Sequence, residues 1–146
     1  MKADLKIEIT HFEENDREQL KLMYLEVRQT NFTWLSKESF NLSSFDKDTD
    51  GEFILVAKVK NEIVGFVSVW LNDNFLHNLY ISNDFQRKGI GRILLNSAIE
   101  LVNSDLTLKC LKKNVLGVRF YLKQEWEPVS EGVSNEGEYI VFKYRK

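Results

Sequence analysis

Three apolar runs separated by short polar turns constrain the fold of this chain most strongly. The runs are FILVAKV (53–59), IVGFVSVWL (63–71) and FLHNLYI (75–81), with turns at Asn61-Glu62 and Asn72-Asp73-Asn74. β-Branched and aromatic residues dominate the runs and favour strands, whereas asparagine and aspartate favour tight turns. The centre of the chain is therefore predicted to form three adjacent antiparallel strands.

Before these runs, the sequence indicates one strand and two helices. Leu5, Ile7 and Ile9 alternate with polar residues, which is the pattern of a half-buried strand. Apolar residues recur at helical spacing between about residues 15 and 27, and a second short helix is predicted between residues 36 and 45. The segment SSFDKDTDGE (43–52) is polar and is predicted to form turns.

After these runs, the pattern alternates between helix and strand. A strongly amphipathic helix is predicted over 90–102, a strand over 106–111, and a helix over 115–123 that Asn114 caps. Two final strands are predicted near 126–130 and 139–144. This order predicts one mixed α/β (α+β) domain over residues 1–146. Its sheet is mostly antiparallel, is flanked by helices and contains one strand–helix–strand crossover, so it is not doubly wound.

Composition and charge argue against several classes of protein. The formal net charge of -2 gives no reason to expect nucleic-acid binding, and no apolar run is long enough to cross a membrane. The opening MKADLKIEIT lacks the apolar core of a signal peptide. Cys110 is the only cysteine, so neither an intrachain disulfide nor a cysteine metal cluster is expected. We therefore expect a cytoplasmic protein without a metal site.

The segment DFQRKGIGR (84–92) carries two glycines between the last central strand and the amphipathic helix. A helix N-terminus has backbone N–H groups without intrahelical partners, and residues without side chains let a phosphate approach them. A tight strand-to-helix turn would also explain the glycines. The cations at Arg87, Lys88 and Arg92 favour a phosphate. Gly91 is followed by Arg92-Ile93, which fits neither a Walker loop nor a dinucleotide-binding fingerprint.

The residues from Gln86 to Gly91 resemble the Gln/Arg-x-x-Gly-x-Gly/Ala signature of the GNAT superfamily, the acetyl-CoA-dependent N-acetyltransferases. The strand NLYI (78–81) ends five residues before Gln86, as it does in that family. Downstream, Asn114, Gly117 and Phe120-Tyr121 resemble the family's Asn-x-x-Ala-x-x-Phe/Tyr-Tyr helix. The order of elements agrees over nearly the whole chain, so the resemblance implies a GNAT-like fold.

The resemblance also implies a cofactor site for acetyl-CoA. Backbone amides in the signature loop would hold the pyrophosphate of coenzyme A, and the preceding strand would pair with the pantetheine arm. The amide near Leu79 would polarise the thioester carbonyl, Asn114 would contact the cofactor, and the Tyr121 hydroxyl would reach its sulfur. The predicted cofactor-binding residues are Leu79, Tyr80, Ile81, Gln86, Arg87, Lys88, Gly89, Ile90, Gly91, Arg92 and Asn114.

The sequence departs from the family pattern at three positions. Glu125 stands where the family often has glycine after the tyrosine helix, so the exit from that helix is expected to differ. Lys109 and Phe75 occupy the two strand positions at which some members carry a catalytic glutamate. No carboxylate base therefore carries over from the family.

Two residues are candidates for the chemistry of acyl transfer. Tyr121 can donate a proton to a departing thiolate, because a thiol has a pKa of about 8.5 and tyrosine one of about 10. Alternatively, Tyr121 is a core aromatic beside Phe120. Side chains at adjacent helix positions diverge by about 100°, so the two residues cannot both point in the same direction into the core. His77 is the candidate base, because strand alternation places it on the face of Leu79 and Ile81. A structural histidine is the alternative. Asn114 serves as a helix cap, a ligand contact or both.

The function predicted from these residues is an N-acetyltransferase in which a bound primary amine attacks acetyl-CoA directly. The alternatives are a degenerate acyl-CoA-binding sensor or regulatory module and a phosphate-binding protein of a different fold. The acceptor is a small molecule or a peptide. The segment RQTNFTWLSKESF (28–40), with Trp70, either closes over it or builds a local core. Family members are commonly dimers, so a homodimer is implied by analogy.

Overall fold

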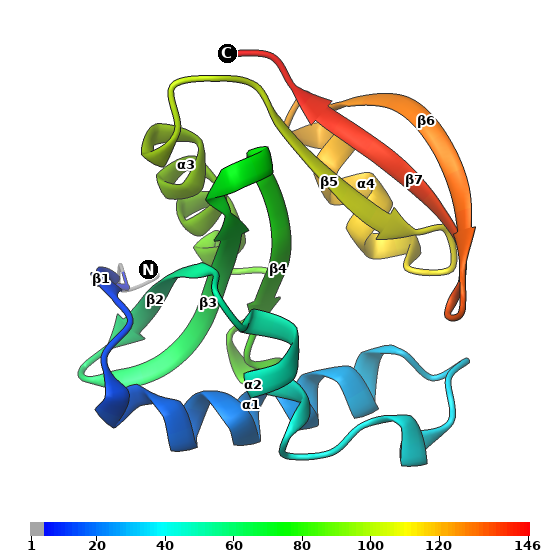
Figure 1. Cartoon of the computed structure of the whole chain (residues 1–146). Coiled ribbons are helices and arrows are strands. Elements are labelled where there is room, and N and C mark those ends of the chain that lie inside the picture. The colour runs from blue at the N-terminus through cyan, green and yellow to red at the C-terminus, as the bar shows by residue number, and fades with distance from the viewer. Residues whose placement is uncertain (1–4) are drawn as a thin grey trace.

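A seven-stranded sheet runs through the protein in the order β1-β2-β3-β4-β5-β7-β6 (Figure 1). The computed structural model describes residues 5–146. Neighbouring strands pair antiparallel, except for β4 and β5, which pair in parallel. This confirms the mixed, mostly antiparallel α+β fold with one crossover. The strands are β1 (Glu8–His11), β2 (Phe53–Val59), β3 (Glu62–Trp70), β4 (Phe75–Ile81), β5 (Leu106–Leu111), β6 (Glu127–Ser134) and β7 (Gly137–Tyr144).

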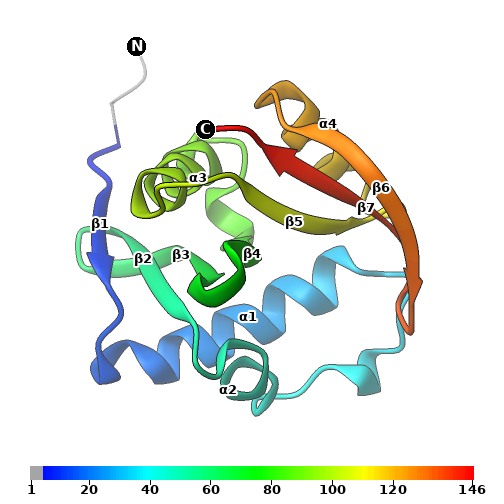
Figure 2. The same ribbon diagram turned by 45° about the horizontal axis from the view of Figure 1, so that its top comes forward.

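Four α-helices cover the two faces of the sheet (Figure 2). They are α1 (Arg17–Asn31), α2 (Ser44–Thr49), α3 (Ile90–Leu101) and α4 (Val115–Lys123). The larger core lies on the side of α3 and α4, and it contains Leu94, Leu95 and Phe142, all without solvent exposure. A smaller core on the other face joins Leu20 of α1 to Phe45 of α2 and to the sheet. None of the helices within residues 5–146 is long and apolar enough to cross a membrane.

The segment between α1 and β2 differs from the sequence prediction. The predicted helix over 36–45 is only one 3-10 turn at Lys37–Ser39, whereas α2 lies inside the segment predicted to form turns. Phe45 is completely buried, Thr49 is 5% exposed, and the Thr49 hydroxyl donates to the Phe45 carbonyl at 2.7 Å. Burial of one side of this short helix thus outweighs its weak local preference.

Strands β4 and β5 meet only where they begin. Phe75 and Thr107 are their one registered pair, and the Thr107 amide donates to the Asn74 carbonyl at 3.1 Å. Beyond this point the two strands diverge, as Figure 1 shows, because β5 follows β7 while β4 stays paired with β3 as far as Ile81. Beyond Phe75, the edge of β4 that faces β5 therefore has no neighbouring strand among residues 5–146.

Candidate active site

The backbone alternation of β4 decides which groups face the unpaired edge. The Ser82 amide donates to the Val64 carbonyl of β3 at 2.8 Å. In an antiparallel pair, successive residues direct their backbone groups to opposite sides. Tyr80 therefore directs its N–H and C=O toward β3, whereas Leu79 and Ile81 direct theirs toward the edge that β5 leaves open. The Gln86 side chain donates to the Ile81 carbonyl at 3.1 Å and so ties the following loop to this edge.

The loop after β4 ends in an open helix N-terminus. Gly89 is the N-cap of α3 with φ 84, and its carbonyl accepts a hydrogen bond from the Ile93 amide at 3.3 Å. Within residues 5–146, the amides from 86 to 92 have no backbone hydrogen-bond acceptor. A Cβ built on Gly89 would meet nothing within 4 Å. The loop thus offers free donors and open space, with Arg87, Lys88 and Arg92 exposed around it.

Gly91 lies in a more crowded place than Gly89. A Cβ on Gly91 would lie 3.4 Å from the Phe120 ring of α4 and 3.9 Å from Ile81 of β4. Both distances are ordinary van der Waals contacts, so packing against α4 and β4 does not by itself require glycine at this position. Of the two loop glycines, Gly89 is the one that combines a left-handed backbone with open space around it.

Both ends of α4 are fixed by capping motifs that orient Tyr121. At the start, the Asn114 side chain accepts from the Gly117 amide at 3.1 Å, which confirms the predicted cap. At the end, the Glu125 amide donates to the Leu122 carbonyl at 3.1 Å and the Trp126 amide to the Tyr121 carbonyl at 3.0 Å. This is a Schellman ending, completed by the Tyr121 and Trp126 rings, whose centroids lie 6.0 Å apart.

The exit from α4 does not differ from the family pattern in the way that the sequence suggested. Glu125 adopts φ 68, the left-handed conformation that a glycine at this position would take easily. The helix thus ends normally although the residue is glutamate. The chain tolerates the backbone strain because the two capping hydrogen bonds and the buried Trp126 ring hold the turn in place.

Tyr121 lies half-buried between the two diverging strands. Burial raises the pKa of its hydroxyl, and Cys110 on β5 and Tyr80 on β4 raise that pKa further. The phenol therefore stays protonated at neutral pH and above it. The rings of Phe120 and Tyr121 lie 5.2 Å apart, and both pack against the larger core but at different places. Phe120 reaches Gly91, whereas Tyr121 reaches Phe142.

His77 does not share a face with Leu79 and Ile81, contrary to the prediction from alternation. Ser68 pairs with Asn78 and Val69 with Leu76, so His77 is an extra residue in a β-bulge. A bulge interrupts the two-residue period of a strand. The side chain instead reaches the opposite face, where its Nδ1 lies 2.6 Å from the Glu52 Oε2. This contact raises the pKa of His77, and burial opposes it to a smaller extent.

Sequence reasoning missed Glu52, which lies immediately before β2. Its carboxylate is 7% exposed and contacts Ser68 and Asn78 as well as His77. These partners lie 16 to 26 positions away along the chain. No local pattern links them, so no signal in the sequence marks Glu52. Cys110 is 5% exposed in β5, as expected of a core residue, and burial raises its pKa to about 12.

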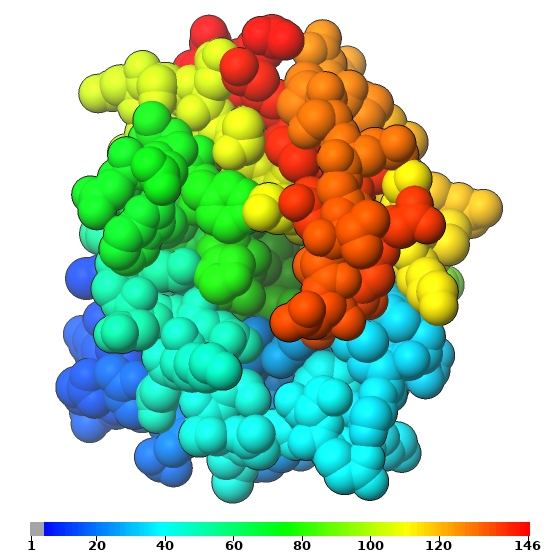
Figure 3. All heavy atoms as spheres, turned by 45° about the vertical axis from the view of Figure 1, so that its right-hand side comes forward, coloured from blue at the N-terminus to red at the C-terminus, as the bar shows by residue number. Residues whose placement is uncertain are grey.

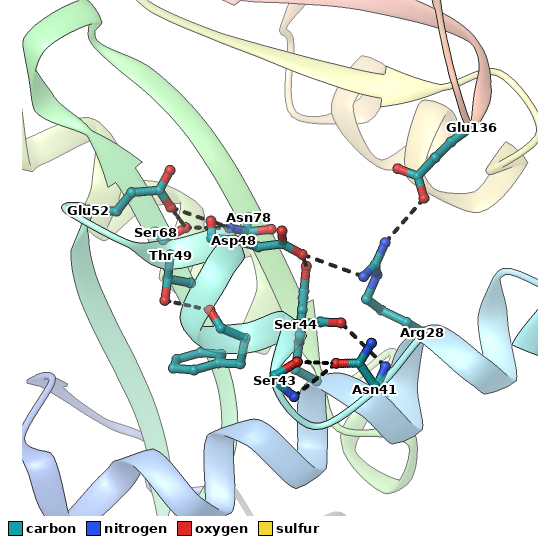
Figure 4. A network of polar contacts seen from close by, with 12 residues as sticks. Arg28, Asn41, Ser43, Ser44, Asp48, Thr49, Glu52, Ser68, Asn78 and Glu136 are labelled. Carbon is teal, nitrogen blue, oxygen red and sulfur yellow. Dashed lines mark hydrogen bonds and ion pairs between the residues drawn. The ribbon is translucent and has the colours of Figure 1, made fainter. Parts of the chain in front are cut away.

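A polar groove of about 610 Å³ lies between the α1–α2 segment and the β6–β7 turn. Figure 3 shows a hollow here, between the cyan segment, the orange-red hairpin and green β4. Arg28 spans the groove, with its guanidinium 3.2 Å from Glu136 and 3.6 Å from Asp48 (Figure 4). The groove lining comprises Arg28, Ser39, Asn41, Ser43, Ser44, Lys47, Asp48, Ser134, Asn135 and Glu136.

The aromatic residues of the 28–40 segment lie under this groove. Phe32 is 9% and Phe40 is 5% exposed, and the Arg28 guanidinium lies 4.6 Å from the Phe40 ring centre. Phe32 and Phe40 are therefore buried, as the local-core alternative expects, and polar side chains line the groove.

The sequence matches the Acetyltransferase (GNAT) family over residues 18–126. The chain belongs to the GNAT family. The match contains the signature loop, the open edge of β4 and the tyrosine helix, which are the elements assembled above.

Solved structures share this GNAT fold over nearly the whole chain. The PaiA N-acetyltransferase of Thermoplasma acidophilum, in complex with coenzyme A, aligns with a TM-score of 0.79 and 20% identity over 96% of this chain and 100% of that one. Apo-form YjaB of Escherichia coli aligns with a TM-score of 0.79 and 19% identity over 96% of this chain and 98% of that one. The ribosomal-protein-alanine N-acetyltransferase of Brucella melitensis aligns with a TM-score of 0.72 and 20% identity over 95% of this chain and 99% of that one.

Proposed function

We propose that this GNAT protein transfers the acetyl group of acetyl-CoA to a primary amine by direct attack in a ternary complex. The observation that carries the proposal is the continuity of an open helix N-terminus at Gly89 with an unpaired strand edge at Leu79 and Ile81. A phosphate suits the first and an extended amide-containing arm suits the second. Membership of the GNAT family and the relative with bound coenzyme A support the same ligand.

Acetyl-CoA supplies the activated acetyl group, and the chain supplies its binding groups. The free amides from Arg87 to Arg92 would hold the pyrophosphate, and their exposed cations would add attraction. The backbone groups of Leu79 and Ile81 would pair with the pantetheine amides, and the Leu79 amide would polarise the thioester carbonyl. Asn114 would contact the cofactor from the start of α4, although its Oδ1 already caps the helix.

The reaction requires a proton to leave the amine and a proton to reach the sulfur. The amine nitrogen forms a bond to the acetyl carbon, and the bond from that carbon to sulfur breaks. His77 would take the amine proton, directly or through a water, at its Nε2. Tyr121 would give its phenolic proton to the departing thiolate. The half-buried position of Tyr121 between β4 and β5 supports this role, because the coenzyme arm would lie between the same strands.

The acceptor would lie in the polar groove beside β4. Hydroxyls and amides from Ser39 to Ser44 and from the 134–136 turn line that groove, together with the carboxylates of Asp48 and Glu136. Such a surface suits a polar amine or the amino group of a peptide. Arg28 neutralises part of the negative charge, which disfavours a polycation as the acceptor.

Two measurements test the proposal. Acetyl-CoA and coenzyme A should raise the melting temperature, and ATP should raise it much less, because only the first two carry the pantetheine arm. Thiol release from acetyl-CoA should then depend on an added amine from a panel of small amines and peptides, with the acetylated product identified by mass. Binding without turnover of any amine would contradict the enzymatic function and favour an acyl-CoA sensor. Equal stabilisation by ATP would contradict the site itself.

A further inference from the structure

We propose that Glu52 is a positioning residue that fixes the ring of His77 so that Nε2 is its free, proton-accepting nitrogen. The inference rests on the proposed acetyl transfer, and it adds a residue that the family signature does not contain. It arises from the junction of β2 and the β4 bulge, where a buried carboxylate faces an exposed imidazole.

The first step rests on the distance between Glu52 and His77 and on the difference in their burial. Nδ1 of His77 lies 2.6 Å from Oε2 of Glu52, which is a short, strong contact. The glutamate side chain is 7% exposed, whereas the histidine side chain is 42% exposed. The carboxylate is therefore held inside the protein, and the imidazole extends from it toward solvent. This is the geometry expected when one residue orients another.

The second step is that the carboxylate itself cannot turn. Asn78 donates to the Ser68 hydroxyl at 2.8 Å, so the Ser68 proton is free to go to Glu52 Oε1, which lies 2.7 Å away. Asn78 also lies 3.4 Å from the same Oε1 and 3.3 Å from the Asp48 carbonyl (Figure 4). Ser68 is completely buried and Asn78 is 4% exposed. Two buried donors thus hold Oε1 and leave Oε2 for His77.

The third step follows from the hydrogen-bonding capacity of the groups. An ionised carboxylate only accepts, so the neutral imidazole must carry its proton on Nδ1. Nε2 then has a lone pair, and the bulge directs the ring away from the core. A base oriented in this way needs no reorganisation when it takes a proton.

The charges around His77 act in the same direction. Glu52 is the nearest, and Asp48 of α2 adds to its effect, so both raise the pKa of the ring. Lys109 of β5 is a cation on the other side, with its Nζ 6.0 Å from the centre of the Phe75 ring, whose centre lies 5.9 Å from that of His77. The two carboxylates outweigh this cation, so the pKa of the ring lies above its ordinary value. The neutral, proton-accepting ring therefore forms at a higher pH than in a free histidine.

The substitution Glu52→Gln provides the sharpest test. Ser68 and Asn78 would hold the amide oxygen, so the amide NH₂ would face Nδ1 and force the ring proton onto Nε2. Nitrogen-15 NMR of histidine-labelled protein reads this tautomer directly, with His77→Gln to separate the signal from that of His11. The neutral wild-type ring should carry its proton on Nδ1, and the Glu52→Gln ring on Nε2. Glu62→Gln, an exposed change at the start of β3, should alter neither.

Kinetics supply the second readout. Glu52→Gln should lower kcat/KM by about 10² to 10⁴-fold, the range for loss of a general base. In wild type, kcat/KM should rise with pH as His77 loses its proton, and Glu52→Gln should remove this rise. The inference is overturned if wild-type His77 carries its neutral proton on Nε2, a result that needs no variant and no turnover. Unchanged kcat/KM and an unchanged pH profile in folded Glu52→Gln would overturn it equally. If wild-type protein acetylates no amine, the proposed function fails, and the tautomer result is still obtained.

Discussion

Replacement of Tyr121 by phenylalanine separates a role in catalysis from a role in packing. The change removes one oxygen and leaves the ring in contact with Phe120, Trp126 and Phe142. No hydrogen bond to that oxygen contributes to its raised pKa, which results from burial and from Cys110 and Tyr80. We therefore expect the free energy of unfolding to change by less than about 1 kcal/mol, since no buried partner loses its hydrogen bond.

The effect on turnover should be much larger than the effect on stability. Loss of a general acid lowers kcat by about 10 to 10⁴-fold, which corresponds to about 1.4 to 5.4 kcal/mol of barrier. Because burial raises the pKa of Tyr121, the phenol remains protonated through pH 6 to 10, so the ratio of the two rates should not vary with pH over that range. Affinity for acetyl-CoA should change little, because the ring is kept.

The assay is the release of coenzyme A thiol at saturating acetyl-CoA, followed with a thiol-reactive dye. Cys110 contributes little background, because it is 5% exposed and its pKa is raised to about 12. Tyr144→Phe is the matched control. It removes the same atom from a half-buried ring that lies 5.6 Å from Trp126, in the same aromatic cluster, and it should leave kcat unchanged. Wild-type turnover in a folded Tyr121→Phe protein would refute the acid role.

Three further predictions concern binding and stability. The double reversal Arg87→Glu with Lys88→Glu should weaken acetyl-CoA binding by about tenfold or more, with a loss that shrinks in high salt, measured by calorimetry. Glu125→Gly should raise the free energy of unfolding by about 0.5 to 1 kcal/mol in urea titrations, because it relieves the strain of φ 68 at some cost in unfolded-chain entropy. The folded pKa of His77 is raised, so its pair with Glu52 should stabilise the protein fully below about pH 6.5 and progressively less as pH rises through the folded value. The difference in melting temperature between wild type and His77→Gln should therefore be larger at pH 5.5 than at pH 9.

Each of these predictions has a control within the same chain. Lys6→Glu with Lys60→Glu makes the same change of charge at exposed positions outside the loop, and an equal loss of affinity there would contradict a local pyrophosphate site. Gln124→Gly lies next to Glu125 at φ -83 and should destabilise the protein. If Glu125→Gly destabilises it as well, strain at that position is not the reason. A difference in melting temperature that grows with pH would reverse the sign assigned to His77.

Local sequence patterns were sufficient for the framework of the site. The apolar runs from 53 to 81 predicted three antiparallel strands, because alternation and turn residues act over only a few positions. The signature at Gln86–Gly91 predicted the loop at the start of α3, and Asn114 predicted the start of α4. These features depend on backbone propensity and capping, which neighbouring residues determine. The sequence was therefore sufficient to predict the family and the starts of α3 and α4, the helices on either side of the proposed coenzyme.

Tertiary structure decided the features that depend on distant partners. A bulge opposite Ser68 and Val69 places His77 on the other face of β4. No residue near His77 in the sequence predicts this bulge. Glu52 became its partner only because β2, β3 and β4 pair side by side. Packing likewise placed Phe120 against Gly91 and held Glu125 in a left-handed turn. Side-chain partnership depends on how the strands pair across the sheet, since contacts across strands join residues that local periodicity treats as independent.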